Sequence, residues 1–414
     1  MSAAGVRGAG LLTLCIAAAL SLGSPVRAAP APLRLNVSAA ALIEASTGRQ
    51  LYGVDADRRL PIASTTKLMT ALLTLERVHR LDTEFAQSSY YPAAADSQIG
   101  LVPGERMSVH DLLLAMLLPS ADDAAEDLAY NVGRHSVPDF VAMMNARARQ
   151  LGLTRTHYST PIGLDTPGNY SSASDLVKLA RFLLRTEPFF RRAVALPRAV
   201  LRTGNHVRVV SNLNDLVARF RWINGVKTGH TLDAGYVLVG SGTQVRMTLI
   251  SAVLGTSSEA ARDGNTLALL GYGFANYMLR TPIRGGALLA RIPVRGRPGT
   301  RAPAIAAKTF TGVFLRFTRV HVRVLVPRQV TGPLPRRSVV GTALVLAGDR
   351  SVARIPLLAA QHVPAAPHAT LLEGLIARPF TLVPLIVLVV ATTGFAMFRL
   401  ERKRGRRPAA RRPA

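Results

Sequence analysis

Along residues 34–280 the apolar residues follow a strand-like pattern first, then a helix-like pattern, and then strand-like segments before a final helix. Val37–Glu44 and Leu51–Val54 are predicted strands, joined by the turn Ala45–Gly48. Helical spacing follows at Leu68–Val78, Val109–Met116, Ala121–Val132, Pro138–Leu151 and Ser172–Leu184. The pattern ends with strands Val226–His230, Tyr236–Gly240 and Met247–Leu254 and a helix Arg262–Leu279. This order predicts an α+β fold in which strands distant in sequence share one sheet.

A second region, residues 282–365, has a different pattern. Valine, arginine, proline and glycine alternate there in short runs, such as Val320–Val326 and Ser338–Leu346. Short alternating runs separated by turn residues are typical of antiparallel strands. We therefore expect a small β-rich domain, which offers few candidate catalytic groups.

The N-terminus is typical of an export signal. Arg7 supplies a positive charge, residues 10–22 are small and apolar, and Val26–Ala28 supplies a small-residue cleavage site. Residues 1–28 are therefore predicted to be a signal peptide, with an uncleaved anchor as the alternative. Cys15 is the only cysteine, so removal of the signal would leave no disulfide, thiol nucleophile or thiolate metal site.

The C-terminus predicts a membrane anchor. Residues 380–398 carry no charge and are long enough to span a bilayer as a helix. The segment 399–414 that follows carries eight basic residues, opposed only by Glu401. By the positive-inside rule this basic tail is cytoplasmic, which would place the preceding domains outside a single-pass protein of the cytoplasmic membrane. A buried apolar helix is the alternative.

The net charge of the 414-residue chain is +27, dominated by arginine. Such a charge suits nucleic acid, anionic lipid or another anionic polymer. Zinc-finger spacing, RNA-binding motifs and aromatic-interleaved basic patches are missing, so we expect no nucleic-acid partner. The termini favour an anionic cell envelope instead. The nine histidines show no metal spacing, and no metal or other cofactor is expected.

The strongest chemical signal is the segment Ser64-Thr65-Thr66-Lys67 before an apolar run. A serine and a lysine three residues apart share one face of a helix, so the amine lies beside the hydroxyl. A neutral lysine can then take the proton of Ser64 and make it a nucleophile. The start of a helix also supplies N–H groups that stabilise an oxyanion. The alternative is a capped helix start with an exposed lysine.

Two weaker signals follow in the chain. Ser120, within Leu117–Ala124, suits a proton relay, although it also fits the N-cap of a helix. Lys227-Thr228-Gly229 can end a strand so that a lysine and a hydroxyl hold a carboxylate. The glycine would let a substrate backbone lie alongside that strand. On a surface strand, the same triplet would have no function.

Together these segments match the S-x-x-K, S-x-N and K-T-G pattern of penicillin-binding proteins and class A β-lactamases. The context resembles the serine D-alanyl-D-alanine carboxypeptidases, which are low-molecular-mass penicillin-binding proteins. The segments that carry this resemblance are Pro61–Thr70, Met144-Asn145, Leu151–Leu153, Gly163–Gly168, Lys227–Thr231 and Ala234–Tyr236. The resemblance implies a β-lactamase-like transpeptidase domain, a sheet with a helical cluster, over residues 34–280.

The resemblance also implies catalytic roles. Ser64 would be the acyl-accepting nucleophile, Lys67 its general base and Ser120 a proton relay. The backbone N–H groups of Ser64 and His230 would form the oxyanion hole. Without metal or cofactor, the enzyme would remove the terminal D-alanine from peptidoglycan stem pentapeptides, and β-lactams would inhibit it by acylating Ser64.

Substrate-binding roles follow from the same resemblance. Lys227 and Thr228 would fix the terminal carboxylate of the substrate, next to Gly229. Arg262 matches a basic residue thought to help hold that carboxylate, with a surface arginine at a helix start as the alternative.

The resemblance also implies a substrate-binding role for Asp122, which departs from the family pattern because asparagine is usual at this position. An ionised carboxylate cannot donate to a substrate carbonyl, and its charge would favour protonated Lys67. Slow turnover is therefore an alternative, as in a penicillin-binding wall sensor. A D,D-endopeptidase, a β-lactamase or a structural envelope protein are further alternatives, of which intact Ser64, Lys67 and Lys227 argue against the last.

Overall fold

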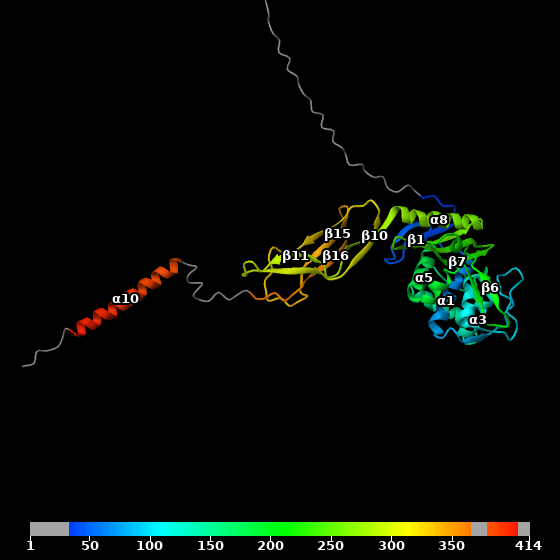
Figure 1. The fold of residues 1–414 in the computed structure, drawn as a ribbon, viewed down its shortest axis with the longest axis horizontal. Coiled ribbons are helices and arrows are strands. Elements are labelled where there is room, and N and C mark those ends of the chain that lie inside the picture. Colours follow the sequence, from blue (N-terminus) through cyan, green and yellow to red (C-terminus); the bar gives the residue numbers. More distant parts are fainter. Residues whose placement is uncertain (1–32, 366–378, 405–414) are drawn as a thin grey trace, which may run out of the picture. The chain divides into compact units, whose positions relative to one another are not determined.

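The computed structural model describes residues 33–365 and 379–404. Its first unit contains a five-stranded sheet whose spatial order is β2-β1-β9-β8-β7. The strands are β1 (Ala39–Glu44), β2 (Gln50–Val54), β7 (Ile223–Thr231), β8 (Gly235–Gln244) and β9 (Met247–Thr256). Strands β1 and β7 of this sheet are labelled in Figure 1. Strand β1 pairs antiparallel with β9, and Ala39 lies opposite Leu254. The prediction of an α+β fold in which distant strands share one sheet is therefore confirmed.

Helices cover both faces of this sheet. One face packs on a cluster formed by α1 (Lys67–Arg77), α2 (Val109–Leu117), α3 (Asp122–Val132), α4 (Val137–Gln150) and α5 (Ala173–Thr186). Helix α8 (Glu259–Asn276) packs on the other face. Alternate residues of β1 enter the two cores, with Ala41 in the first and Leu42 in the second. Burial on both faces explains why β1 is apolar from Ala39 to Ile43.

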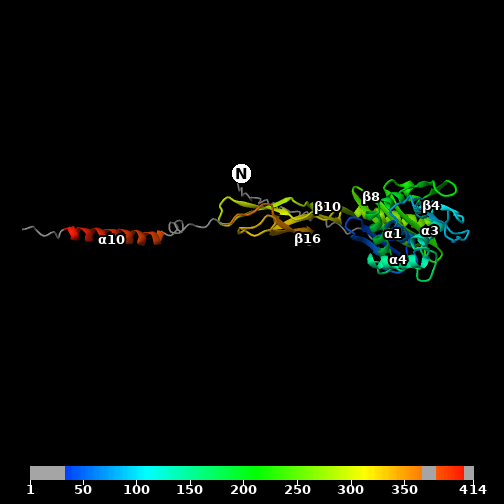
Figure 2. The ribbon, with the colours of Figure 1, turned by 90° about the horizontal axis from the view of Figure 1, so that it is seen from below.

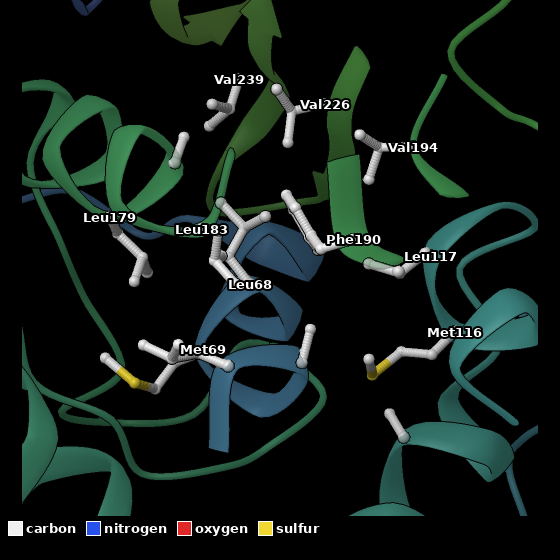
Figure 3. Packing of buried hydrophobic residues seen from close by; sticks show 14 of the residues in the cluster. Leu68, Met69, Met116, Leu117, Leu179, Leu183, Phe190, Val194, Val226 and Val239 are labelled. Carbon is white, nitrogen blue, oxygen red and sulfur yellow. The ribbon is translucent and has the colours of Figure 1, made fainter. Parts of the chain in front are cut away.

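Helix α1 lies in the middle of the first core. Figure 3 shows Leu68 and Met69 of α1 among Leu179 and Leu183 of α5 and Phe190. Eight consecutive residues at the start of α1, from Lys67 to Thr74, are buried. A helix surrounded by packed side chains has little freedom to shift, so the core fixes the position of the residues at its N-terminus.

The structure corrects the predicted end of the last helix of this unit. Helix α8 ends at Asn276, whereas the apolar spacing predicted a helix that continues to Leu279. The next residues form β10 (Tyr277–Ile283), which pairs with β13 (Phe310–Leu315). The hydroxyl of Tyr277 also donates to the carbonyl oxygen of Leu51 at 3.1 Å. These tertiary partners, which local spacing does not report, decide the conformation.

Several short elements were not predicted. They are β3 (Glu84–Ala86), β4 (Arg106–Ser108), α6 (Pro188–Ala193), β5 (Arg198–Leu201), β6 (Arg208–Ser211) and α7 (Leu216–Arg219). All have three to six residues, a length at which periodicity carries little information.

The second unit is built on an antiparallel five-stranded sheet with the order β11-β12-β16-β15-β14. Its strands are β11 (Leu288–Pro293), β12 (Arg301–Ala306), β14 (Val320–Leu325), β15 (Val339–Ala347) and β16 (Arg350–Ala359). Strand β16 of this sheet is labelled in Figure 2. Of the described residues, the unit comprises 281–311 and those from 319 onward, because Gly312–Thr318 groups with the first unit. That segment lies inside the range 282–365 predicted for the β-rich domain.

The predicted signal peptide, residues 1–28, lies outside the described residues, as does most of the basic tail. Residues Pro379–Arg404 form helix α10. Across the described parts of the chain, the structure has no helix that is both long and apolar enough to cross a membrane, so the predicted spanning helix 380–398 is not confirmed.

Candidate active site

The candidate nucleophile lies at the start of the buried helix α1. A single 3₁₀ turn, Ala63–Thr66, leads into α1, and Ser64 lies in that turn with its side chain partly exposed. Lys67, the first residue of α1, is completely buried, and its Nζ lies 2.8 Å from Ser64 Oγ. The one-turn spacing therefore places an amine against a hydroxyl that solvent can reach.

The Lys67 amine has two further oxygen partners. Its Nζ donates to Asp122 Oδ1 at 2.6 Å and to the carbonyl oxygen of Ile162 at 2.8 Å. Burial lowers the pKa of Lys67 below its ordinary value, and the neighbouring Asp122 carboxylate opposes that shift. Burial likewise raises the pKa of Asp122, opposed by Lys67. Both shifts move the two groups toward their neutral forms.

The segment 160–170 holds α1 from the side of Lys67. Thr70 Oγ1 donates to the carbonyl oxygen of Pro161 at 2.6 Å, and Asn169 Nδ2 donates to Thr66 Oγ1 at 3.2 Å. Gly163 has φ +97°, and a Cβ there would lie 2.1 Å from the carbonyl oxygen of Ala63. Only glycine allows this approach. This role of the segment was not predicted from the sequence, although Gly163–Gly168 is one of the motifs that carry the family resemblance.

Ser120 lies between α2 and α3 in an unusual environment. Its backbone has φ +68°, a left-handed conformation that non-glycine residues seldom adopt. The side chain is buried, and Oγ has no hydrogen-bond partner among the described residues. A buried hydroxyl without a partner is costly for stability and is therefore typical of a functional position.

The two adjacent aspartates at the start of α3 have different surroundings. Asp122 contacts Lys67, whereas Asp123 accepts hydrogen bonds from the backbone N–H groups of Ile99, Gly100 and Leu101. Asp123 therefore anchors a loop and Asp122 belongs to the candidate site. Asp122 was predicted to bind substrate, and in the structure its carboxylate contacts Lys67.

Strand β7 brings the third predicted motif to the same place. Lys227 and Thr228 are buried there, and Lys227 Nζ donates to the carbonyl oxygen of Thr228 at 3.0 Å. A Cβ on Gly229 would lie 3.0 Å from the backbone nitrogen of Ser64. The lack of a side chain at Gly229 thus allows the strand to lie against the turn that carries the nucleophile.

Two other predicted substrate-binding residues lie near this strand. The ring of exposed His230 stacks on Tyr236, with ring centroids 4.0 Å apart. Arg262 is buried on α8, where it pairs with Asp263 and Glu259 at 2.8 and 2.7 Å. Burial, followed by the positive charges of Lys67 and Arg262, holds the pKa of Lys227 well below its usual range. Arg262 is therefore a buried neighbour of Lys227.

The described residues contain no cluster of side chains suited to binding a metal ion. Within residues 33–365 and 379–404, no three histidine, cysteine, aspartate or glutamate side chains cluster in a way that could hold a metal ion. The described site consists of two lysines, two serines, an aspartate and a glycine-bearing strand.

A partly exposed serine beside a buried lysine, with a second serine and a second lysine on neighbouring elements, defines a serine hydrolase that works through an acyl-enzyme. The family model described as D-alanyl-D-alanine carboxypeptidase matches residues 26–258. The chain belongs to this family.

Individual relatives extend the similarity beyond the first unit. The chain is 28% identical to D-alanyl-D-alanine carboxypeptidase DacF of Bacillus subtilis over 347 residues, which cover 82% of this chain and 88% of that protein. Identity to DacC of Escherichia coli is 31% over 336 residues, covering 78% and 83%. The solved structure of penicillin binding protein 5 from Haemophilus influenzae matches with a TM-score of 0.67 at 26% identity, covering 81% and 99%.

Proposed function

We propose that this protein is a serine-type D-Ala-D-Ala carboxypeptidase that removes the terminal D-alanine from peptidoglycan stem pentapeptides. The observation that carries the proposal is the 2.8 Å contact between Nζ of fully buried Lys67 and Oγ of Ser64. A buried amine with a lowered pKa can be a base near neutral pH, and the Ser64 hydroxyl, whose proton Lys67 would take, is already in contact with it.

Acylation follows from this geometry. Ser64 Oγ attacks the carbonyl carbon of the penultimate D-alanine while its proton passes to Lys67 Nζ. The backbone N–H groups of Ser64 and His230 stabilise the oxyanion. The C–N bond then breaks, and the leaving amine takes the proton from Lys67 through Ser120. D-alanine departs, and the rest of the peptide remains bound to Ser64 as an ester. Water attacks the ester in a second step, which releases the shortened peptide and returns the proton to Ser64.

Binding of the substrate's terminal carboxylate is assigned to strand β7 and its neighbours. Lys227 and Thr228 bind this carboxylate, and the positive charge of buried Arg262 lies nearby. Gly229 leaves room for the peptide backbone beside Ser64. A β-lactam carries a similar carboxylate and a reactive carbonyl, so it acylates Ser64 and inhibits the enzyme.

The test is release of free D-alanine from a synthetic stem pentapeptide by the purified full-length protein. We expect release by the wild type, covalent labelling by a fluorescent penicillin, and loss of both in Ser64→Ala. Labelling of Ser64→Ala at the wild-type rate would overturn the assignment of the nucleophile. Cleavage of cross-linked muropeptide dimers without D-alanine release would instead indicate an endopeptidase, and rapid penicillin hydrolysis a β-lactamase.

A second candidate function is a penicillin-binding wall sensor that acylates but turns over slowly. The contact between Asp122 and Lys67 favours it, because a carboxylate at 2.6 Å stabilises the protonated lysine. Stoichiometric penicillin labelling, together with D-alanine release of no more than one equivalent per enzyme, would support the sensor over the enzyme.

We also propose that the protein is exported and held in the cytoplasmic membrane by one C-terminal helix. The support is in the sequence: an N-terminal signal pattern, the uncharged residues 380–398 and the basic tail 399–414. Protease added to intact spheroplasts should then degrade the catalytic domain and spare the tail. A protected catalytic domain would contradict this topology.

A further inference from the structure

The surroundings of Lys67 Nζ determine when it can be a base. Its three oxygen partners are Ser64 Oγ at 2.8 Å, Asp122 Oδ1 at 2.6 Å and the carbonyl oxygen of Ile162 at 2.8 Å. The carbonyl oxygen only accepts hydrogen bonds, and so does an ionised carboxylate. A neutral amine has two hydrogens and one lone pair. If the hydrogens go to Ile162 and Asp122, the lone pair is directed at Ser64.

The protonated lysine fits the same three partners differently. An ammonium group has three hydrogens, so it donates to Ser64 as well and cannot take the serine proton. The site is therefore competent when Lys67 is neutral and resting when it is charged. Asp122 contacts the nitrogen in both forms, but its attraction to the charged form is much the stronger.

We propose that Asp122 is a positioning residue that orients Lys67 and stabilises the ammonium formed as Ser64 attacks, completing a Ser64–Lys67–Asp122 triad. This inference rests on the proposed function. The role corresponds to that of the aspartate beside histidine in a serine–histidine–aspartate triad, which stabilises the cation formed on proton transfer. Asparagine, the usual residue at this position, can orient the amine but cannot neutralise the cation.

An ionised Asp122 neutralises the charge that Lys67 gains when it takes the proton of Ser64. During attack the Ser64 Oγ–H bond breaks, an Nζ–H bond forms on Lys67, and Oγ forms its bond to the substrate carbonyl carbon. With Asp122 ionised, lysine and aspartate together change from a net charge of −1 to zero. Because the pair is buried, with Asp122 only 3% exposed, this neutralisation occurs where water screens charge poorly.

The same contact has a cost in the resting enzyme. Asp122 favours the charged lysine before substrate arrives, and the more distant carboxylates of Asp96 and Asp123 act in the same direction. The positive charge of Lys227, on β7, lowers the pKa of Asp122. The positive charge of Arg262 in turn lowers the pKa of Lys227. Removing the Asp122 charge should therefore increase the fraction of neutral Lys67 and, at the same time, weaken each neutral Lys67 as a base.

These opposed effects predict acylation profiles that cross. The experiment measures the second-order rate of labelling by a fluorescent penicillin between pH 6 and 11, for the full-length wild type and Asp122→Asn. The variant should reach half of its plateau about one pH unit or more lower than the wild type. Its plateau should be about tenfold lower, so it is faster at low pH and slower at high pH.

Asp96→Asn is the matched control, because it removes a nearby negative charge that does not contact Lys67. It should shift the midpoint less, in the same direction, and leave the plateau unchanged. A uniform change of the Asp122→Asn rate at every pH would show a merely structural role and overturn the inference, as would a variant that is faster throughout.

Folding of each variant is checked by circular dichroism, and Asp122→Ser repeats the measurement if Asp122→Asn does not fold. Failure of the proposed function is distinguishable, because it would appear as persistent labelling of Ser64→Ala or as no D-alanine release by the wild type. Neither result depends on where the two pH profiles lie.

Discussion

Gly229 on β7 lies against the backbone of Ser64, so closely that a Cβ on the glycine would be 3.0 Å from the serine nitrogen and 2.9 Å from Ala63 Cβ. The contact joins two elements that are more than 160 residues apart in the chain. It brings the strand that would hold the substrate to the turn that carries the nucleophile. In the proposed mechanism, this serine N–H is one of the two oxyanion donors.

A Gly229→Ala substitution should therefore slow acylation while leaving the fold intact. The methyl group must displace either β7 or the turn, and a small misplacement of reacting groups can lower the rate about 10²-fold. Second-order penicillin labelling and kcat/KM for D-alanine release measure the effect. Gly264→Ala on α8 is the control, because a Cβ there meets no atom within 4 Å. Equal rates for Gly229→Ala and the wild type would refute the role of this contact.

The sequence predicted the parts of the site that depend on local spacing. Ser64 and Lys67 are one turn apart on a helix, so their contact follows from helix geometry once that helix exists. The α+β order of strands and helices was predictable for a related reason, since the apolar pattern records which faces are buried. The assignment of Ser120 and Lys227 to the same site as this helix followed from family resemblance and not from spacing.

Other features of the site depend on tertiary packing and leave no local signal. The carbonyl oxygen of Ile162 binds Lys67 across 95 residues of sequence, and any residue type supplies such a carbonyl. Asp122 was noticed because it departs from the family pattern, but its 2.6 Å contact with Lys67 depends on how α3 packs on α1. The end of α8 at Asn276 depends similarly on the pairing of β10 with β13.

Ser120→Ala should separate stability from activity. The hydroxyl is buried without a partner among the described residues, so its removal should leave the free energy of unfolding unchanged or raise it by about 1 kcal/mol. Loss of a proton relay should nevertheless slow D-alanine release about 10²-fold. Thermal unfolding and steady-state kinetics of the full-length protein test the two halves of this prediction. An active variant would exclude Ser120 from the relay.

Glu126 on α3 should make the protein less stable as the pH rises. Burial, with the nearby charges of Asp127 and Asp122, raises the pKa of Glu126 from 4.5 to about 7. Between these values the folded state keeps a proton that the unfolded state loses, so stability falls as pH increases through this window. Glu126→Gln should therefore increase the free energy of unfolding by roughly 1–3 kcal/mol at pH 8 and have no effect at pH 4.

Denaturant unfolding at both pH values measures the Glu126 effect, and Asp57→Asn, at an exposed site in the same unit, is the control. The control should change stability little at either pH. A Glu126→Gln variant that is equally stabilised at pH 4 and pH 8 would show that the gain has another origin than the carboxyl proton.

Substrate binding should draw a proton onto Lys227. Burial and the charges of Lys67 and Arg262 keep the pKa of this amine well below its usual range in the free protein. A substrate carboxylate beside the amine favours its charged form and must raise that pKa. Binding above the free-state pKa is therefore coupled to uptake of on the order of one proton, and affinity for the carboxylate should weaken as the pH rises.

Calorimetry on the full-length Ser64→Ala variant tests the Lys227 prediction without turnover. Pentapeptide binding is measured in two buffers that differ in ionisation enthalpy, so proton uptake appears as a difference between the two binding enthalpies. Adding Lys227→Gln should remove the part of that difference that comes from Lys227, because the amine that gains the proton is gone, whereas any contribution from Lys67 would persist. Equal enthalpies in both buffers for Ser64→Ala alone would mean that Lys227 is already charged before the substrate arrives.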